Sequence, residues 1–299
     1  MKARNTITRQ SIATAIAMSS SLVMASGLAA SARAEPASPH PKGSESRVSE
    51  SRAANSATPA AASTESALPE AAAVTRMLDE LWRANASHAR LTMAVTTGRG
   101  NRELKLESWS SGSELVLVVV RAPAREAGVA TLRTEEGLWS YAPRADRLIR
   151  VPAGLLADGW MGSHFTNDDL VRESSYQEDY DAKLGWMNEG GQRLIQLTLT
   201  PKPGAPVVYT RIEFRIEPGT LVPLRADYFD GNTPVRQMNF SKVRNVGGKA
   251  VPHLLQLIPL DRKHVGEQTT LEYDTLETGV TVDAQLFSKQ GLRRAAARP

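Results

Sequence analysis

The residues best suited to chemistry lie within residues 158–172, where His164, Asp168 and Asp169 offer the side chains of metal ligands or of a general acid and base. Their spacing disfavours both roles, because adjacent carboxylates at the start of one helix point in different directions and a metal needs three or four convergent ligands. Ser163 and His164 are a poor nucleophile and base, because sequence neighbours rarely face each other and no G-x-S-x-G elbow is present. No P-loop, dinucleotide fingerprint or zinc spacing occurs elsewhere in the sequence. The sequence therefore predicts neither an enzyme nor a bound metal or other cofactor.

The same segment carries large apolar side chains between glycines. Trp160, Met161 and Phe165 allow two interpretations. They are either a hydrophobic plug that packs the loop onto the core, or a movable cover over an apolar cavity, for which methionine is suited by its pliability. In the second interpretation Gly159 and Gly162 act as hinges, because glycine lets the backbone turn sharply.

A short helix is predicted to begin at Thr166 or Asn167, either of which can cap it. Thr166-x-x-Asp169 fits a capping box, and Asp168 and Asp169 both lie where the helix dipole favours negative charge. Capping therefore accounts for both aspartates without a catalytic role.

The chain around this segment is predicted to be mostly β-sheet, because its apolar residues recur with period two. Roughly eleven strands are expected, at residues 91–96, 103–108, 115–120, 138–141, 148–151, 193–200, 207–216, 221–228, 234–243, 253–260 and 269–278. Short turns separate the later ones, which is typical of an antiparallel meander. So many strands do not form a flat open sheet. We expect a single curled antiparallel sheet, or incomplete β-barrel, with a few helices covering its apolar concave face.

Two of these strands predict how the faces of the sheet are covered. Ile212, Phe214 and Ile216 alternate with charged residues, so these three should line the interior, as packed core or as cavity wall. Residues 115–120 are apolar on both faces, which predicts a strand that is covered on both sides.

A helix is predicted to precede the strands. It opens at Pro69 and is expected to end at Asn85 and Ser87. Its apolar side chains follow a helical spacing and form one stripe, made of Val74, Met77, Leu78, Leu81 and Trp82. Such a stripe indicates a packing face against the sheet.

Residues 1–34 are predicted to be a signal peptide, because a positive start and an apolar run lead to Ala32-Arg33-Ala34, with cleavage between Ala34 and Glu35. A membrane anchor is the alternative, but serines interrupt the run before it reaches ~18 residues. The chain has no cysteine, so no lipid anchor is expected. Residues 35–68 have the composition of a disordered tether, and residues 69–299 form the expected single domain.

The net charge of the chain comes from this leader. The 36 basic residues include four within residues 1–34, and without those four the remaining 32 match the 32 acidic residues. The expected mature protein is therefore neutral, which argues against a nucleic acid as partner.

The central segment resembles one protein family. Residues 159–170 read G-W-M-G-S-H-F-T-N-D-D-L, and the outer-membrane lipoprotein-sorting (LolA-like) proteins typically have W-M-G-S-D-F-T-N-D-D-L here. His164 thus departs from an acidic residue. Further matches are Trp139-Ser140-Tyr141-Ala142-Pro143, Pro223-Leu224-Arg225, Asp230-Gly231 and residues 247–252, so that the resemblance spans about residues 78–278.

The resemblance implies an incomplete β-barrel that is lined with apolar side chains and binds lipid or lipoprotein acyl chains in the periplasm. Members with this central motif are often linked to transporters of the resistance-nodulation-division (RND) type. The implied partners are an inner-membrane transporter of the RND or ABC type and an outer-membrane acceptor.

Two functions therefore compete. The first is a periplasmic carrier that moves acyl chains between the inner and outer membranes. The second is a sensor or scaffold of similar fold that binds a lipoprotein or transporter partner and carries nothing. Known modules of the second kind resemble this fold with a second small domain, for which residues 286–299 leave no room. The sequence therefore favours the carrier.

Overall fold

The computed structural model describes residues 67–81, 86–112, 114–171, 175–205 and 207–298. Every described residue except Ala67 belongs to one compact unit, which contains Leu68–Pro299. The predicted signal peptide, its cleavage site at Ala34 and Glu35, and the tether up to residue 66 lie outside the described residues.

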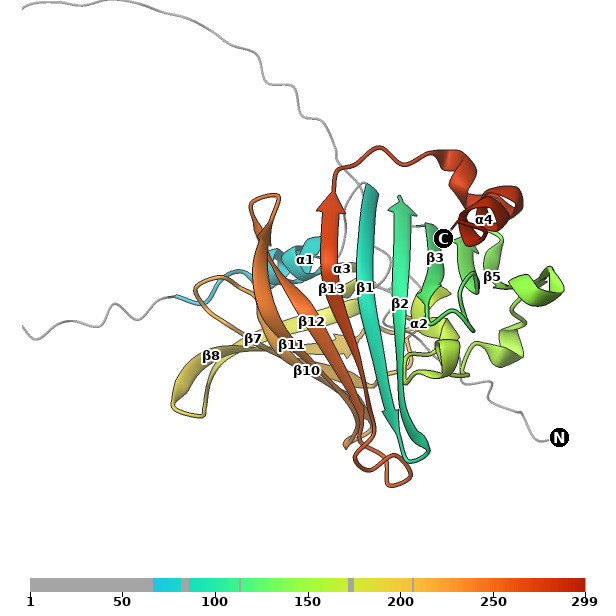
Figure 1. Cartoon of the computed structure of the whole chain (residues 1–299). Coiled ribbons are helices and arrows are strands. Elements are labelled where there is room, and N and C mark those ends of the chain that lie inside the picture. Colours follow the sequence, from blue (N-terminus) through green and yellow to red (C-terminus); the bar gives the residue numbers. More distant parts are fainter. Residues whose placement is uncertain (1–66, 82–85, 113, 172–174, 206, 299) are drawn as a thin grey trace, which may run out of the picture. The chain divides into compact units, whose positions relative to one another are not determined.

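Thirteen strands form one antiparallel sheet (Figure 1). The strands are β1 (Ala86–Thr97), β2 (Gly100–Ser111), β3 (Leu115–Ala122), β4 (Ala130–Thr134), β5 (Gly137–Ala142), β6 (Arg147–Arg150), β7 (Tyr180–Glu189), β8 (Gln192–Pro201), β9 (Arg211–Ile216), β10 (Pro223–Asp230), β11 (Thr233–Val246), β12 (Lys249–Pro259) and β13 (Gln268–Thr278). Strands that follow each other in the chain pair with each other, except β6 and β7. Strand β1 pairs with β13 and joins the two meanders, so the sheet is not closed into a barrel and ends at β6 and β7. The predicted fold class is confirmed.

The chain between the two edge strands must cross from one end of the sheet to the other, because β6 and β7 are consecutive in the chain. This connection contains the 3-10 turns η3 (Ala153–Leu155) and η4 (Trp160–Gly162), followed by the short helices α2 (Asn167–Val171) and α3 (Tyr176–Asp179). The segment singled out by the sequence is therefore part of the crossing between the open edges of the sheet.

Helices cover one face of the sheet, here called the inner face. Helix α1 (Ala71–Leu81) contributes Val74 and Leu78 to its apolar cluster, while α2 contributes Leu170 and α3 contributes Tyr176. Figure 1 shows α1 and α3 behind the strands, and the two helices contact each other. The predicted stripe of the first helix thus packs as expected, while its last member, Trp82, lies outside the described residues.

The opposite, outer face is covered over only part of its width. Along β3, Val116, Val118 and Val120 belong to the inner cluster, whereas Leu117 and Val119 belong to a second cluster on the outer face. This second cluster is closed by η5 (Ala284–Phe287) and α4 (Lys289–Ala296), which lie beside β3 (Figure 1). The two-sided burial predicted for residues 115–120 is confirmed.

The structure corrects several local predictions. Strands β4 and β7 were not expected, because β4 buries the charged Arg133 beside Glu114 and β7 is a half-exposed edge strand without clean alternation. Strand β9 begins at Arg211 rather than at residue 207. Ser87 does not end the first helix but lies in β1, where its hydroxyl is 2.7 Å from the Ser110 hydroxyl. Helix α4 was not predicted either.

Candidate functional site

The inner face carries one continuous apolar cluster, to which eleven of the thirteen strands contribute. Ile212, Phe214 and Ile216 lie in it and are at most 2% exposed, as are Trp160 and Phe165 from the connection. The Phe214 ring meets the Tyr176 ring edge-on, with 5.4 Å between centroids. Side chains from the connection and from the sheet therefore share one apolar interior.

The Trp160 loop is fixed to the sheet by a buried hydrogen bond. The indole Nε1 of Trp160 donates to the Thr131 hydroxyl of β4 at 3.0 Å. Within the loop, the Trp160 N–H donates to the Phe165 carbonyl at 2.6 Å, and the Ser163 N–H donates to the Trp160 carbonyl at 2.9 Å. Trp160 thus enters the interior with its only polar atom satisfied.

The two glycines of the loop serve different geometrical needs. Gly162 has a φ of +68° and follows Met161, whose φ of +48° is unusual for a residue with a side chain. At Gly159 a Cβ atom would lie 2.5 Å from the carbonyl oxygen of Ser163, so only glycine allows this approach. Met161 packs at the margin of the apolar cluster, and Arg102 donates to its carbonyl at 2.7 Å. A hinge role for the glycines remains a prediction.

His164 lies apart from the aspartates. Its Nδ1 is 2.8 Å from the Thr269 hydroxyl of β13, and its Nε2 is 3.0 Å from Glu267. The His164 ring also meets the His264 ring edge-on, 5.9 Å away. The side chain therefore ties the loop to β13 and to the turn before it, and it does not converge with Asp168 or Asp169.

Helix α2 begins with reciprocal hydrogen bonds between Thr166 and Asp169. The Thr166 N–H donates to the Asp169 carboxylate at 2.7 Å, and the Asp169 N–H donates to the Thr166 hydroxyl at 3.1 Å. The Asn167 side chain donates to the Leu155 carbonyl at 3.1 Å, and Asp168 is buried. This is the geometry of a capping box.

Asp169 also belongs to a buried polar cluster. Nη1 of Arg236, on β11, lies 3.3 Å from the Asp169 carboxylate and donates to the Tyr209 hydroxyl at 2.9 Å. The guanidinium also lies 5.4 Å from the centroid of the Tyr228 ring. Burial acts to lower the pKa of Arg236, but Asp169 and the two tyrosines raise it above its ordinary value, so the guanidinium stays charged. Burial raises the pKa of Tyr228 well above its ordinary value.

The sequence prediction missed this cluster, although a signal for Arg236 was present. Arg236 is in phase with Met238 and Phe240, so the period-two pattern of β11 places a charged residue on the apolar face. Its partners Asp169 and Tyr209 are 67 and 27 residues away in the chain. Only the three-dimensional fold brings the three together.

The inner face is dominated by apolar side chains. Within the described parts of the chain, no three histidine or acidic side chains gather in a way that would hold a metal ion. None of the helices between residues 67 and 298 that the structure describes is long and apolar enough to span a membrane. The inner face carries a large apolar cluster, and the polar cluster of Asp169, Tyr209 and Arg236 lies within it.

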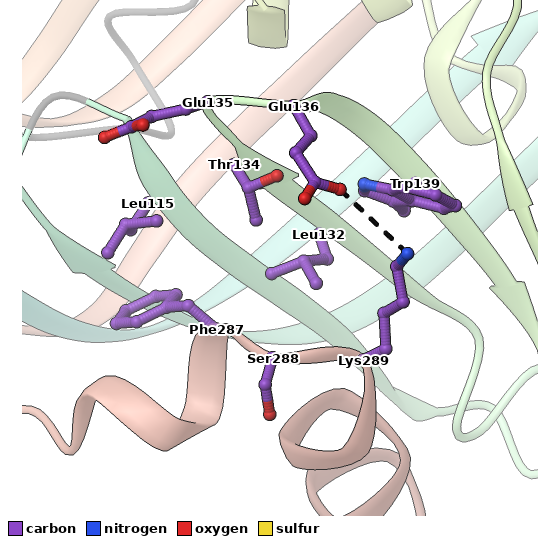
Figure 2. Close-up of a pocket in the computed structure, with 9 residues that line it drawn as sticks. All are labelled: Leu115, Leu132, Thr134, Glu135, Glu136, Trp139, Phe287, Ser288 and Lys289. Carbon is purple, nitrogen blue, oxygen red and sulfur yellow. Dashed lines mark ion pairs between the residues drawn. The ribbon is translucent and has the colours of Figure 1, made fainter.

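A separate cavity of about 330 Å³ lies on the outer face, away from all predicted site residues. It is an open pocket between β3–β5 and the residues around Ser288, where η5 meets α4 (Figure 2). Lys289 lies 4.0 Å above the Trp139 ring and 4.0 Å from Glu136, as Figure 2 shows. Because its own lysine occupies the aromatic face, this cavity is a less suitable site for an acyl chain than the inner face.

Comparison with known proteins identifies the fold. A family model described only as "uncharacterized protein" matches residues 112–294. A solved DUF1329 family protein from Desulfovibrio piger is 22% identical with a TM-score of 0.65, over 74% of this chain and 97% of that one. A comparison with curated proteins found no significant match.

Two further solved structures carry the sorting-protein fold. An outer membrane lipoprotein-sorting protein domain from Vibrio parahaemolyticus is 19% identical with a TM-score of 0.59, over 70% of this chain and 92% of that domain. A LolA superfamily protein from Nitrosomonas europaea is 18% identical with a TM-score of 0.60, over 75% of this chain and all of that protein. The LolA-like resemblance of the sequence is therefore confirmed for the fold, whereas the link to RND transporters remains a prediction.

Proposed function

Because the chain belongs to the family matched over residues 112–294 and has a LolA-like fold, we propose that it is a periplasmic carrier of lipid or lipoprotein acyl chains. The inner face is the binding surface, and the connection between β6 and β7 is the cover that moves to admit cargo. The observation that carries this proposal is the continuous apolar cluster beneath α1 and the connection between β6 and β7, which contains α2 and α3.

Specific polar contacts hold the cover to the sheet. Trp160 bonds to Thr131, His164 to Thr269, and Asp169 pairs with Arg236. The cover also contains Met161 in a left-handed conformation, which costs of order 1 kcal/mol and is relieved when the loop rearranges. An acyl chain that replaces the apolar contacts of Trp160 and Phe165 shifts the equilibrium toward the open form.

The compartment and the route are parts of the same proposal. Residues 1–34 have the pattern of a cleaved signal peptide. The cargo is proposed to come from an inner-membrane transporter of the RND or ABC type and to pass to an outer-membrane acceptor.

Lipid binding is the direct test. Protein isolated from its native envelope is extracted with organic solvent and examined by mass spectrometry, and lipid-free protein is incubated with vesicles of phosphatidylethanolamine and phosphatidylglycerol. We expect a soluble protein–lipid complex in both cases. Native protein without lipid, together with no uptake from vesicles, would contradict the carrier and favour a scaffold that binds a partner protein.

A further inference from the structure

Arg236 is a buried cation on the mostly apolar inner face of the sheet. It lies on β11 between residues of the inner cluster, and its side chain is only 9% exposed. Burying a charged group is costly unless its hydrogen-bonding capacity is met. The number of hydrogen-bond partners of its guanidinium therefore determines how much of this cost remains.

The protein satisfies this guanidinium incompletely. Nη1 makes all of its hydrogen bonds, to Tyr209 at 2.9 Å and to the two oxygens of Asp169 at 3.3 and 3.4 Å. Nε and Nη2 are buried without a hydrogen-bond acceptor among the residues that the structure describes. A two-pronged arginine–carboxylate pair would use a second nitrogen as well. The donors on Nε and Nη2 remain available to a ligand that enters the interior.

The surrounding charges select the kind of acceptor. Asp169 already balances the charge of Arg236, and both Asp168 and Asp169 act on the neighbouring Tyr209 and raise its pKa in addition to the effect of burial. A second anion at this point would find no positive charge left to pair with, and burying an unpaired charge is costly. A neutral carbonyl oxygen accepts from a charged donor without that penalty.

We infer that Arg236 binds the carbonyl oxygen of an ester or amide linkage at the polar end of an acyl chain. This inference rests on the proposed carrier function and specifies its cargo as ester- or amide-linked chains rather than free fatty acids. The rings of Tyr209 and Tyr228 flank the guanidinium and provide apolar surface for the first methylene groups of the chain.

The test compares ligands that differ only at the linkage. Methyl laurate, its ether analogue dodecyl methyl ether, and the laurate anion compete with a fluorescent acyl probe for wild-type protein. We expect the ester to bind ~10- to 100-fold more tightly than the ether, because this is the gain in affinity expected from a hydrogen bond between the ester carbonyl and a charged donor. We expect laurate to bind less tightly than the ester.

The matched variant is Arg236→Met with Asp169→Asn, which removes both charges and leaves no buried ion without its partner. It should bind the ester and the ether with equal affinity, because releasing the cover changes the affinity for both ligands alike and only the preference for the ester depends on the guanidinium. Arg244→Met, at an exposed position of the same strand, is the control and should keep the preference.

The other outcomes separate a failure of the Arg236 role from a failure of the carrier function. An equal ester preference in the wild type and the double variant, or tighter binding of laurate than of the ester, would overturn the role of Arg236 and leave the carrier function standing. If wild-type protein binds neither neutral ligand, the carrier function fails and the inference fails with it.

Discussion

The two faces of the sheet are covered in different ways. On the outer face, α4 and η5 close an apolar cluster with Leu292 and Phe287, and α4 is capped by the Ser288 hydroxyl, which accepts from the Gly291 N–H at 2.9 Å. On the inner face, the connection between β6 and β7 is held by polar contacts inside the interior, above all Asp169 with Arg236. A cover that serves only stability has no need of a buried ion pair. Under the proposed function, the inner cover opens to exchange its contacts for cargo and the outer cover stays in place.

Removing the buried cation alone should have the largest effect on stability. Arg236→Met leaves the Asp169 carboxylate buried without the guanidinium, which costs ~3–5 kcal/mol of unfolding free energy. Adding Asp169→Asn should restore most of this loss, because neither charge then remains. Urea denaturation of the single and double variants measures both values. A single variant as stable as wild type would show that the pair does not hold the inner cover.

Apolar truncations on the two faces separate stability from binding. Phe214→Ala on the inner face should cost ~3–5 kcal/mol, and Leu292→Ala on the outer face ~2–5 kcal/mol, because both side chains are buried in a packed cluster. Only Phe214→Ala should alter the affinity for an acyl probe. If both variants lose stability and both bind the probe as wild type does, Phe214 is ordinary core and not part of a binding surface.

The hydrogen bond of Trp160 is expected to have an intermediate effect. Trp160→Phe removes the donor to the buried Thr131 hydroxyl and should cost ~1–3 kcal/mol. Amide hydrogen exchange should become faster across residues 158–171 and stay unchanged in β3. Trp139→Phe, at a half-buried position on the outer face, is the control and should leave the exchange of that segment as it is.

The smallest expected effect is on the pH dependence of thermal stability. Hydrogen bonds from the Gly98 N–H and from His164 lower the pKa of the Glu267 carboxyl below 4.5. A lowered pKa means that the stabilisation is fully present above pH 4.5 and is lost as the pH falls through the pKa of the folded protein. Wild type should therefore melt at a higher temperature than Glu267→Gln at neutral pH, and the difference should disappear in strong acid. A difference that grows as the pH falls would be inconsistent with this assignment.

The fold could largely be predicted from the sequence, because its main signal is local. The residue patterns of β9 and β3 predict which of their faces are buried. The capping residues predict the short helix after Thr166. Strand β7 could not be predicted, because an edge strand with exposed positions lacks that alternation. The exact order of the sheet depends on the pairing of β1 with β13, which no local pattern specifies.

The candidate site was predicted only in part. The sequence indicated the apolar residues Trp160 and Phe165, because large side chains between glycines are unusual in a loop. It explained Asp169 as a capping residue, and the structure adds an ion pair across 67 residues of chain. Arg236 was missed because an arginine within a strand is usually assigned to the solvent face.

Locking the cover shut is the most direct test of the central claim, that the connection between β6 and β7 opens to admit cargo. The printed sequence has no cysteine, and the side chains of His164 and Thr269 contact each other with 2.8 Å between Nδ1 and the hydroxyl, so His164→Cys with Thr269→Cys is the pair chosen for a disulfide across the cover, to be verified by thiol titration. We predict that the oxidised double variant takes up no fluorescent lipid from vesicles and that reduction restores uptake, while each single variant takes up lipid with or without oxidant. Equal uptake by the oxidised and reduced double variant would contradict the account.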